Sequence, residues 1–465
     1  MIYSEPLRPS TTAARARKLG KFSFAFGPRF FVALLLGFVA LGPAWWFRQA
    51  IAAMFLWDGV VLGAWLWDLL RLPRPEQLEV QRTWEKRPCL GVPGNVGVEL
   101  RNGGGISIRA RIVDETPAQL RSEPPELELR VKARSSAEAR YAVMPAERGD
   151  TRLGRLFLRY QSPLGLAERW AVAETQQTIR VLPNLEQARR QTLYLIRSRQ
   201  VELEKRRRRQ RGIGREFDSL REYRQGDEVR DISWTATARR RHLITRVFQI
   251  ERSQNVWLVL DAGRLLRAQV REPGDAPRFS KLDYAVNAAL SLAQVALYCG
   301  DRVGLLAYGR RVQQNLYASR GAHHVRAIVE SLAQVRAEAF ESDHGRAVRA
   351  LLNAQKRRSL VVWITDFAET ATIPEVIEYA MQLTPRHLVV FAAMGQPDLQ
   401  TLAETIPAVT ADIYRHGAAL EISQRRDILL RGLRQRGVLA LELMPGMLAG
   451  SLVTQYLNIK ERSLL

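Results

Sequence analysis

The sequence predicts an α/β protein: a doubly wound α/β domain over residues 253–465, preceded by a two-helix membrane hairpin and a small antiparallel β-sandwich. Continuous apolar runs that alternate with helical periodicity predict the α/β domain, because strands covered on both faces are apolar throughout. Two charge-poor segments near the N-terminus predict the hairpin, and short alternating runs separated by glycine and proline predict the sandwich. The length of 465 residues, 46% of them hydrophobic, allows two or three domains.

Residues 1–29 are polar and basic, with Glu5 as the only acidic residue, and we expect them to form a cytoplasmic tail. Residues 30–72 follow with two apolar runs. The first, from Phe30 to Phe47, carries no charge and is long enough for a membrane span. Asp58 interrupts the second run, and it either contacts a partner helix or, as we prefer for a short hairpin, lies near the outer interface. Basic flanks predict that two spans return the chain to the cytoplasm.

Residues 76–183 change character to about seven short alternating runs, which are typical of a small antiparallel β-sandwich. Val96–Leu100 and Leu127–Val131 are two of these runs, and Asn102–Gly105 is one of the glycine-rich turns between them. No catalytic pattern lies in this stretch. We therefore expect a spacer or a docking module.

Residues 184–252 form a basic linker that starts as a helix and reaches a polybasic run. The chain has a formal net charge of +23, from 70 Lys and Arg against 47 Asp and Glu, which indicates a polyanionic neighbour. The sequence shows no helix-turn-helix, zinc finger or aromatic-plus-basic strand, so nucleic acid is the less favoured partner. Anionic lipid headgroups of the bilayer are favoured instead. The residues expected to bind them are Lys205, Arg206, Arg207, Arg208, Arg209 and Arg211.

The segment 212–239 interleaves opposite charges with apolar side chains, and Gly226-Asp227 predicts a tight turn within it. One interpretation, which we prefer, is structural: Trp234 and Tyr223 fill a groove between domains, and Arg221, Arg230 and Asp231 form a buried ion-pair network. The other is a partner surface in which aromatic and arginine side chains dominate binding, and one residue set can do both. The candidate residues are Phe217, Leu220, Arg221, Tyr223, Gly226, Asp227, Arg230, Trp234 and Arg239.

The strings Glu-Phe-Asp-Ser-Leu-Arg-Glu-Tyr and Gly-Asp-Glu-Val-Arg-Asp-Ile-Ser-Trp in this segment resemble the signature of a bacterial family. It is the family catalogued as domain of unknown function fifty-eight, and the resemblance covers residues 200–460. The resemblance implies a membrane-anchored relative of the von Willebrand factor A domain. It also implies a MoxR-type AAA+ ATPase as partner and a place in the bacterial inner membrane. It implies no activity.

Residues 253–465 alternate strand and helix, and the strands are apolar runs suited to a parallel sheet. The expected strands are Val256–Leu260, Val303–Tyr308, Leu360–Thr365, Leu388–Ala392 and Val438–Leu443. The expected helices are Ser280–Tyr298, His323–Val335, Ile373–Leu383, a long region ending at Gly437, and Gly450–Lys460, which packs back onto the fold. This alternation agrees with the von Willebrand A-like fold that the resemblance implies.

Asp261 and Asp366 close two of these strands, and ligands of doubly wound sheets bind at the carboxyl ends of strands. Metal-binding von Willebrand A domains read Asp-x-Ser-x-Ser at the first of these positions, with a distant Thr and a second Asp. Here Gly263 and Leu265 replace both serines, and the Thr equivalent falls near Ser319-Arg320. Mg²⁺ held by Asp261 and Asp366 through water is one alternative. We prefer the other, in which Asp261 pairs with Arg264 or an arginine of 212–239.

The sequence contains no Walker A, Gly-x-Ser-x-Gly or His-Glu-x-x-His motif, so we expect no enzymatic activity and no cofactor apart from the Mg²⁺ alternative. The two cysteines, Cys89 and Cys299, are expected to be packing residues. The leading hypothesis is an inner-membrane-anchored adaptor or scaffold. Its cytoplasmic domain would partner a MoxR-type AAA+ ATPase in assembly or remodelling of envelope proteins. The alternative is a membrane-tethered binder of anionic lipid or nucleic acid through residues 205–211.

Overall fold

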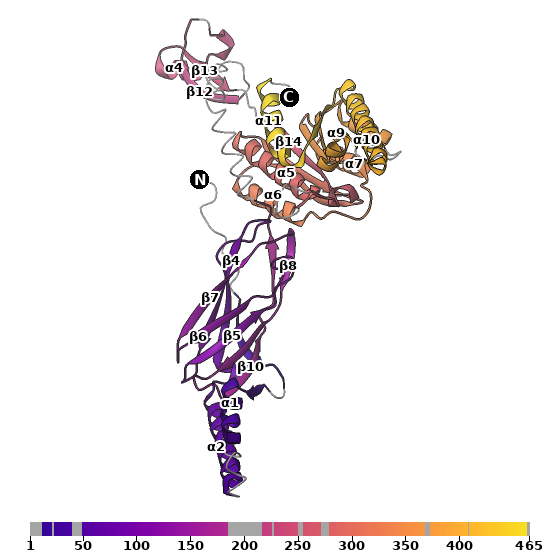
Figure 1. The fold of residues 1–465 in the computed structure, drawn as a ribbon. Helices are drawn as coiled ribbons and strands as arrows, with labels where there is room; N and C mark the ends of the chain where they lie inside the picture. The colour runs from indigo at the N-terminus through magenta and orange to yellow at the C-terminus, as the bar shows by residue number, and fades with distance from the viewer. Residues whose placement is uncertain are drawn as a thin grey trace. The chain divides into compact units, whose positions relative to one another are not determined.

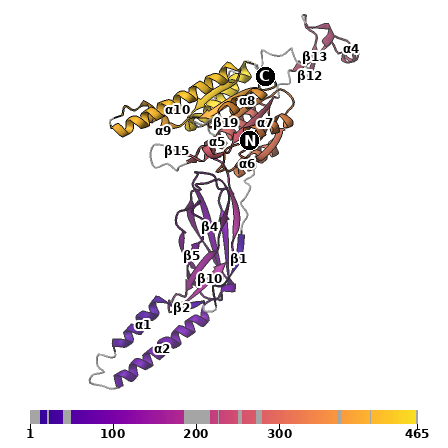
Figure 2. The ribbon, with the colours of Figure 1, turned by 90° about the vertical axis from the view of Figure 1, so that its right-hand side faces the viewer.

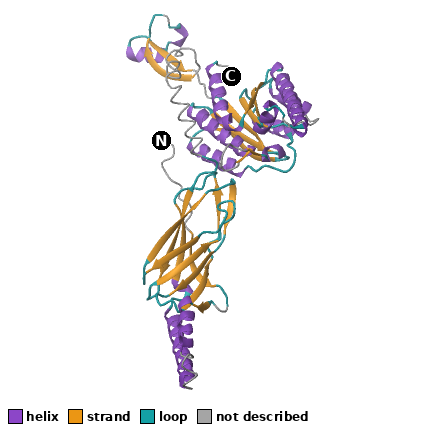
Figure 3. Cartoon of the chain, viewed as in Figure 1, coloured by secondary structure: helices purple, strands orange, loops and turns teal. Residues whose placement is uncertain are grey.

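The structure is a computed structural model that describes residues 12–20, 23–39, 49–184, 216–225, 227–249, 254–270, 279–367, 373–407 and 409–462 (Figure 1). The chain divides into two compact units, Met1–Leu182 and Pro183–Leu465. The first unit is built mainly of strands and the second mixes strands with helices (Figure 3). The expected α/β composition is therefore confirmed.

The first unit is dominated by a set of antiparallel strands in the order β6-β5-β9-β10-β1-β3-β4-β7, with β2 paired to β10. Polar and apolar residues alternate along these strands, as in β3, and this places one face of each strand in a common core. A separate pair joins β8 to β11. The strands are β1 (Thr12–Lys18), β2 (Phe24–Phe26), β3 (Leu78–Trp84), β4 (Gly94–Asn102), β5 (Ile108–Asp114), β6 (Glu126–Val131), β7 (Ser136–Val143), β8 (Gly149–Leu153), β9 (Leu156–Gln161), β10 (Ala167–Ala173) and β11 (Gln177–Val181).

Strand β1 corrects the prediction that residues 1–29 form a tail. Its first half pairs with β3 and its second half with β10, so that it joins two groups of strands. Ala16 is fully buried in the core that these groups share. The segment Thr-Ala-Ala-Arg-Ala-Arg-Lys has no strong strand former. It is a strand because two partner strands, distant in sequence, supply the hydrogen bonds, and such context overrides propensity.

Helices α1 (Pro28–Phe38) and α2 (Gln49–Arg71) pack against each other, and Figure 2 shows them running side by side. The indole Nε1 of Trp57 donates a hydrogen bond of 2.8 Å to the carbonyl of Ala33. Among the described residues, one helix, Ile51–Arg71, is long and apolar enough to cross a membrane, and α1 is apolar but shorter. Asp58 faces Gly37 of α1, where an added Cβ would lie 2.9 Å from its Oδ1.

The second unit contains a six-stranded sheet in the order β18-β17-β14-β19-β20-β21. Five strands are parallel, and β18 is antiparallel to β17 at one edge. Strand β18 was not predicted, because its mixed polar pattern is that of an exposed edge rather than a buried strand. The strands are β14 (Asn255–Asp261), β17 (Arg302–Tyr308), β18 (Val312–Ser319), β19 (Leu360–Thr365), β20 (Leu388–Met394) and β21 (Leu439–Leu443).

Helices cover both faces of this sheet (Figure 2). Trp257 and Val259 of β14 lie in one core cluster with side chains of α7, α8 and α10, and the alternate residues of β14 face the opposite side, where α5 contacts the strand. α11 packs on α5. The helices are α5 (Lys281–Tyr298), α6 (Ala322–Gln334), α7 (His344–Ala354), α8 (Ile373–Leu383), α9 (Pro397–Glu404), α10 (Thr410–Gln435) and α11 (Leu448–Glu461).

Two smaller elements complete the described residues of the second unit. A short strand pair, β15 (Gln269–Val270) and β16 (Phe279–Ser280), precedes α5. A hairpin of β12 (Glu216–Glu222) and β13 (Ile244–Gln249) carries α4 (Trp234–Arg240) in its connection. We call residues 216–249 the signature hairpin, because they hold most of the segment singled out in the sequence.

Candidate functional site

Asp261 ends β14 and is almost completely buried, with 4% of its surface exposed. Its Oδ1 accepts a hydrogen bond of 2.8 Å from the amide of Gly263 and another from the hydroxyl of Ser342. Its Oδ2 accepts a bond of 2.6 Å from Thr365 Oγ1 at the end of β19. Ser342 and Thr365 therefore supply hydroxyls that the segment directly after Asp261 lacks.

Asp366 follows β19 and is balanced by two cations of the same chain. Lys281 Nζ lies 2.5 Å from Oδ2, and Arg426 Nη1 lies 3.0 Å from Oδ1, which also accepts the amide of Phe367 at 2.8 Å. All three charged side chains are nearly inaccessible to solvent. A buried carboxyl group without such partners would cost several kcal/mol, and this pairing offsets that cost.

Arg426 belongs to α10 and ties that helix to the carboxyl ends of the sheet strands. Its Nε lies 2.8 Å from Glu442 of β21, and its other nitrogens donate to the carbonyls of Phe367 and Met394, both at 2.6 Å. The guanidinium also lies over the Phe367 ring, 4.7 Å from its centroid. The planar fork of arginine suits this many-sided contact, which a lysine would not reproduce.

The predicted ion pair between Asp261 and Arg264 is wrong, because Arg264 lies 3.4 Å from Glu341. Within the described residues, Asp261 is hydrogen-bonded to Gly263, Ser342 and Thr365, and the ion pairs form on Asp366 instead. A Mg²⁺ ion approaching Asp366 would meet the Lys281 ammonium at hydrogen-bond distance, so the residues present do not fit a Mg²⁺ site. Among the described residues, no group of three or more His, Cys, Asp or Glu side chains has the arrangement of a metal site.

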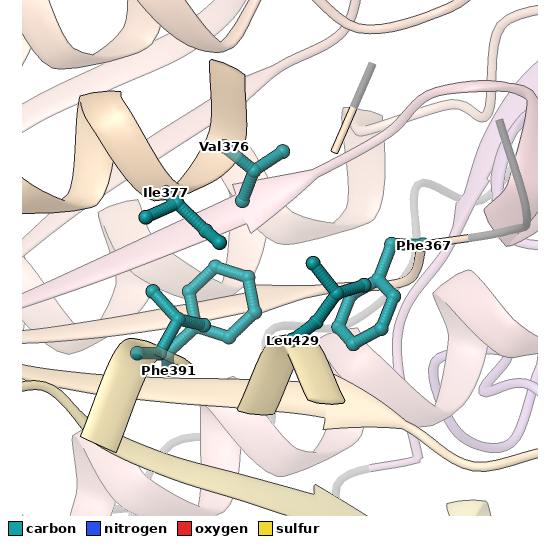
Figure 4. Close-up of a pocket in the computed structure, with 6 residues that line it drawn as sticks. Phe367, Val376, Ile377, Phe391 and Leu429 are labelled. Carbon is teal, nitrogen blue, oxygen red and sulfur yellow. The ribbon is translucent and has the colours of Figure 1, made fainter. Parts of the chain in front are cut away.

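An apolar hollow lies beside this network, where α8 and α10 cover the sheet (Figure 4). Val376 and Ile377 of α8 face Phe391 of β20 across it, and Phe367 closes one side. Leu429 and Leu433 of α10 complete the lining. All the described residues that line this hollow are apolar, so it offers them packing space.

The signature hairpin is folded by local polar contacts. Asp227 Oδ1 accepts Arg221 Nη2 at 2.7 Å, and its Oδ2 accepts the amide of Arg224 at 3.0 Å. The backbone hydrogen bond from Arg224, followed by the Arg221 guanidinium, lowers the pKa of Asp227 below its ordinary value. Thr237 Oγ1 of α4 accepts the amide of Ile244 at 3.0 Å, which holds the helix on β13.

The preferred structural interpretation of this segment is wrong for Trp234 and Arg230. Trp234 is 63% exposed, and Arg230, which lies 2.5 Å from Glu228, is also on the surface. Leu220, Val229 and Leu243 are exposed apolar residues of the same hairpin, and Arg239 is also exposed. Only Ile232, Ile244 and Thr245 of the hairpin are buried among the side chains described. The prediction that these side chains are buried was wrong because the described apolar residues of the hairpin do not gather in a large core.

Of the other predicted residues in the signature segment, Tyr223 and Phe217 belong to the described residues. Tyr223 is half-buried, and its amide donates to the carbonyl of Leu243. The backbone of Phe217 pairs with Phe248. Gly226 and the polybasic residues Lys205, Arg206, Arg207, Arg208, Arg209 and Arg211 lie outside the described residues. Lys281, Ser342 and Arg426 were missed by sequence reasoning, since nothing in their local pattern distinguishes them from surface residues.

Known proteins resemble parts of this chain. Uncharacterised proteins of Mycobacterium tuberculosis (strain ATCC 25618 / H37Rv) and Mycobacterium bovis (strain ATCC BAA-935 / AF2122/97) are each 31% identical over 158 residues, 34% of this chain. That stretch is 48% of either relative, so the chain spans about half the length of the curated relatives it matches. Among solved structures, the conserved hypothetical protein BatB from Bacteroides thetaiotaomicron has 13% identity and a TM-score of 0.30, over 45% of this chain and 100% of that one. Residues 219–424 match the family described as "Protein of unknown function DUF58", and this match lies within residues 200–460, over which the sequence resembles that family.

Proposed function

We propose that this protein is a membrane-anchored adaptor without enzymatic activity, whose second unit binds a partner protein through the signature hairpin. The observation that carries the proposal is the exposure of Trp234, Val229, Leu220 and Leu243 on a hairpin with few buried side chains. Tryptophan and arginine are enriched among the residues that dominate protein–protein binding. A two-stranded hairpin is only marginally stable alone, so a surface of this kind gains from being covered.

The α/β domain is proposed to be von Willebrand A-like and doubly wound. In support, the chain runs from β14 outward to β17 and β18, and then returns to the other side of β14 as β19. This reversal is a switch point, where doubly wound sheets bind ligands at the carboxyl ends of the strands. Asp261 ends β14 and Asp366 follows β19 at this point, and the internal cations Lys281 and Arg426 support a scaffold that works without metal.

The anchor is proposed to be a two-span hairpin of residues 30–72 in the bacterial inner membrane, with both termini cytoplasmic. The apolar helix Ile51–Arg71 supports one span. Strand β1 precedes the hairpin and strand β3 follows it, yet the two pair with each other. Because both ends of the membrane hairpin join the same sheet, the chain enters and leaves the membrane on the same side. It therefore crosses the membrane an even number of times or does not cross it. The basic flanks place that side in the cytoplasm.

A MoxR-type AAA+ ATPase is the proposed partner, on the strength of the family resemblance, and the process served is assembly or remodelling of envelope proteins. The test is affinity purification of the tagged full-length protein from detergent-solubilised membranes, with and without a non-hydrolysable ATP analogue. We expect nucleotide-dependent recovery of an AAA+ ATPase.

The variant Trp234→Ala with Val229→Ala should lower that recovery about tenfold, as expected for the loss of a binding hot spot. Tyr317→Ala is the matched control, because Tyr317 is an equally exposed aromatic residue, 67% exposed, on β18 of the sheet. Recovery that is unchanged in the double variant would remove the hairpin from the interface. Absence of any ATPase from the wild-type sample would overturn the proposed partner and favour the alternative, anionic lipid binding through residues 205–211.

A further inference from the structure

The end of the β-sandwich that adjoins α1 and α2 carries a group of exposed, large apolar side chains. Phe24 and Phe26 of β2 are 42% and 41% exposed, Leu164 in the β9–β10 turn is 48% exposed, and Trp67 of α2 is 52% exposed. Single exposed apolar residues are ordinary on protein surfaces. Four of them from three distant segments at one end of a domain need a covering partner or an apolar environment.

Specific contacts bring these segments together. The aromatic rings of Phe24 and Phe26 lie 6.0 and 4.7 Å from the ring of Trp65 on α2. Arg29 Nη1 donates to the carbonyls of Pro163 and Leu164 at 3.0 and 3.2 Å, so the β9–β10 turn is tied to the start of α1. We call the set Phe24, Phe26, Trp67 and Leu164 the basal collar.

The collar is held rigidly on the helices. Asp68 is 1% exposed, and its Oδ2 accepts the amide of Ala167 at the start of β10 at 3.0 Å. Arg169 Nη2 donates to the carbonyl of Leu69 at 2.9 Å, and Tyr160 Oη donates to that of Pro73 at 2.8 Å. Leu69 and Leu72 also belong to the core of the sandwich. The end of α2 is therefore a built-in part of the sandwich and not a flexible tether.

Cationic side chains accompany the collar. The Arg71 guanidinium lies over the Trp67 ring, 4.5 Å from its centroid, and Arg29 and Arg74 are exposed. Aromatic side chains prefer the boundary between headgroups and acyl chains, where one side is apolar and the other polar. Arginines at that depth attract the anionic headgroups of the cytoplasmic leaflet. The collar thus has the apolar part and the cationic part that a lipid interface recognises.

We infer that the basal collar is a lipid-binding surface that seats the β-sandwich in the headgroup region of an anionic bilayer. The inference rests on the proposed membrane anchoring, because it treats the collar as the continuation of the apolar surface of α2. Contact between the collar and the headgroups fixes the tilt of the sandwich, because the helices and the collar must both fit the same bilayer. The opposite end of the sandwich is then held away from the bilayer.

The experiment compares two labelled positions in the full-length protein. Leu164→Cys is placed in the collar and Met144→Cys at the far end, after Cys89 and Cys299 have been changed to serine. Met144 is 49% exposed, similar to Leu164, and directly follows β7. The other end of β7 lies near Gln77, which comes shortly after α2: Ser135 accepts the amide of Asn102, and the adjacent Gly103 donates to the carbonyl of Gln77. The eight residues of β7 separate Ser135 from Met144, which gives a distance of about 30 Å along the extended strand. Each cysteine carries nitrobenzoxadiazole, and the protein is reconstituted in vesicles of phosphatidylcholine and phosphatidylglycerol.

Quenching by a lipid with a spin label near the headgroup should be about threefold stronger at position 164 than at position 144, because only position 164 lies at the interface. Replacing phosphatidylglycerol with phosphatidylcholine should weaken the quenching at position 164. Equal quenching at the two positions, in protein that floats with the vesicles, would overturn the seat and leave the anchor intact. Protein that does not float with the vesicles would overturn the anchor and the seat together.

Discussion

Lys281 and Arg426 place two cations of the same chain against the buried carboxyl group of Asp366. In the low-dielectric interior these pairs replace the solvation that each group loses on folding. Lys281 is the first residue of α5, whose capping box of Ser280 and Asp283 fixes where the helix starts. The helix start thus sets the position of the ammonium group. A tethered cation of this kind is permanent, whereas a bound metal ion can leave.

Removing the Lys281 ammonium should leave Asp366 under-compensated. We expect Lys281→Ala to reduce the free energy of unfolding of the second unit by about 3–5 kcal/mol, the usual cost of breaking a buried pair from one side. The measurement is urea unfolding of the full-length protein in detergent. As a control, Arg264→Ala removes a surface partner of Glu341 and should change stability by less than about 1 kcal/mol. Equal effects of the two variants would contradict the assigned role of Lys281.

The same variant makes the metal question testable. With Lys281 present we expect neither Mg²⁺ nor EDTA to change the melting temperature. In Lys281→Ala, Asp366 Oδ2 loses the ammonium group that lies 2.5 Å away, and a carboxylate oxygen without a cation partner is a ligand that suits Mg²⁺. Millimolar Mg²⁺ should then restore part of the lost stability in the variant alone, because a ligand of the native state stabilises it. A Mg²⁺-dependent melting temperature in the wild-type protein would refute the tethered-cation interpretation.

At the scale of single elements, the signature hairpin depends on one carboxylate. Asp227 has a lowered pKa in the folded hairpin, because it accepts the amide of Arg224 and the guanidinium of Arg221. A carboxylate with a lowered folded pKa contributes stability above its unfolded pKa, and this contribution is lost as the pH falls through the folded pKa. We therefore expect the hairpin to lose order as the pH falls below 3.8, the ordinary value for Asp.

Hydrogen exchange at the Arg224 amide, followed from pH 6 down to about pH 3, measures this loss. Asp227→Asn is the control, because the asparagine side chain does not titrate. In this variant the Arg224 amide should exchange faster than in the wild-type protein. Its exchange should depend on acid only through the remaining carboxylates. Identical pH profiles for the wild-type protein and Asp227→Asn would show that another group governs the hairpin.

Strand β1 allows a second test at this scale. Ala16 is fully buried between the strands that β1 joins, and its neighbour Arg17 is exposed. Ala16→Glu places an unpaired carboxylate in the sandwich core, which should destabilise the first unit by several kcal/mol. Arg17→Glu, one position away, should change stability by less than about 1 kcal/mol. Limited proteolysis of both proteins provides the measurement, and equal resistance to cleavage would show that β1 does not contribute to the sandwich.

These elements also show what the sequence could predict. Leu360–Thr365 was predicted to the residue, because a strand buried on both faces must be apolar throughout. Strand β1 was missed because its residues have low strand propensity and its partner β3 begins sixty residues later. Asp261 and Asp366 were identified because strand ends are local features. Lys281 and Arg426 were not, because only the tertiary fold brings them to Asp366, and a lone lysine or arginine in a helix is typical of a surface.

At the scale of the whole molecule, the pairing of β1 with β3 constrains how the chain crosses the membrane. Thr12–Lys18 and Leu78–Trp84 pair with each other, so in the proposed anchoring the residues before and after the membrane hairpin lie on the same side of the bilayer. The basic residues that flank the hairpin favour the cytoplasm as that side. In the proposed topology the chain reaches the opposite side only between its two spans.

A membrane-impermeant maleimide added to intact spheroplasts tests this topology. A cysteine introduced at Arg48, in a chain with Cys89 and Cys299 changed to serine, should react from outside, because this residue directly follows the first proposed span, Phe30–Phe47. A cysteine at Met144, which is 49% exposed on the sandwich, should react only after the membrane is permeabilised. Labelling of both positions from outside would place the sandwich and the second unit outside the cell. Labelling of neither, with position 144 reacting after permeabilisation, would indicate a hairpin that enters the bilayer from the cytoplasm and returns without crossing it.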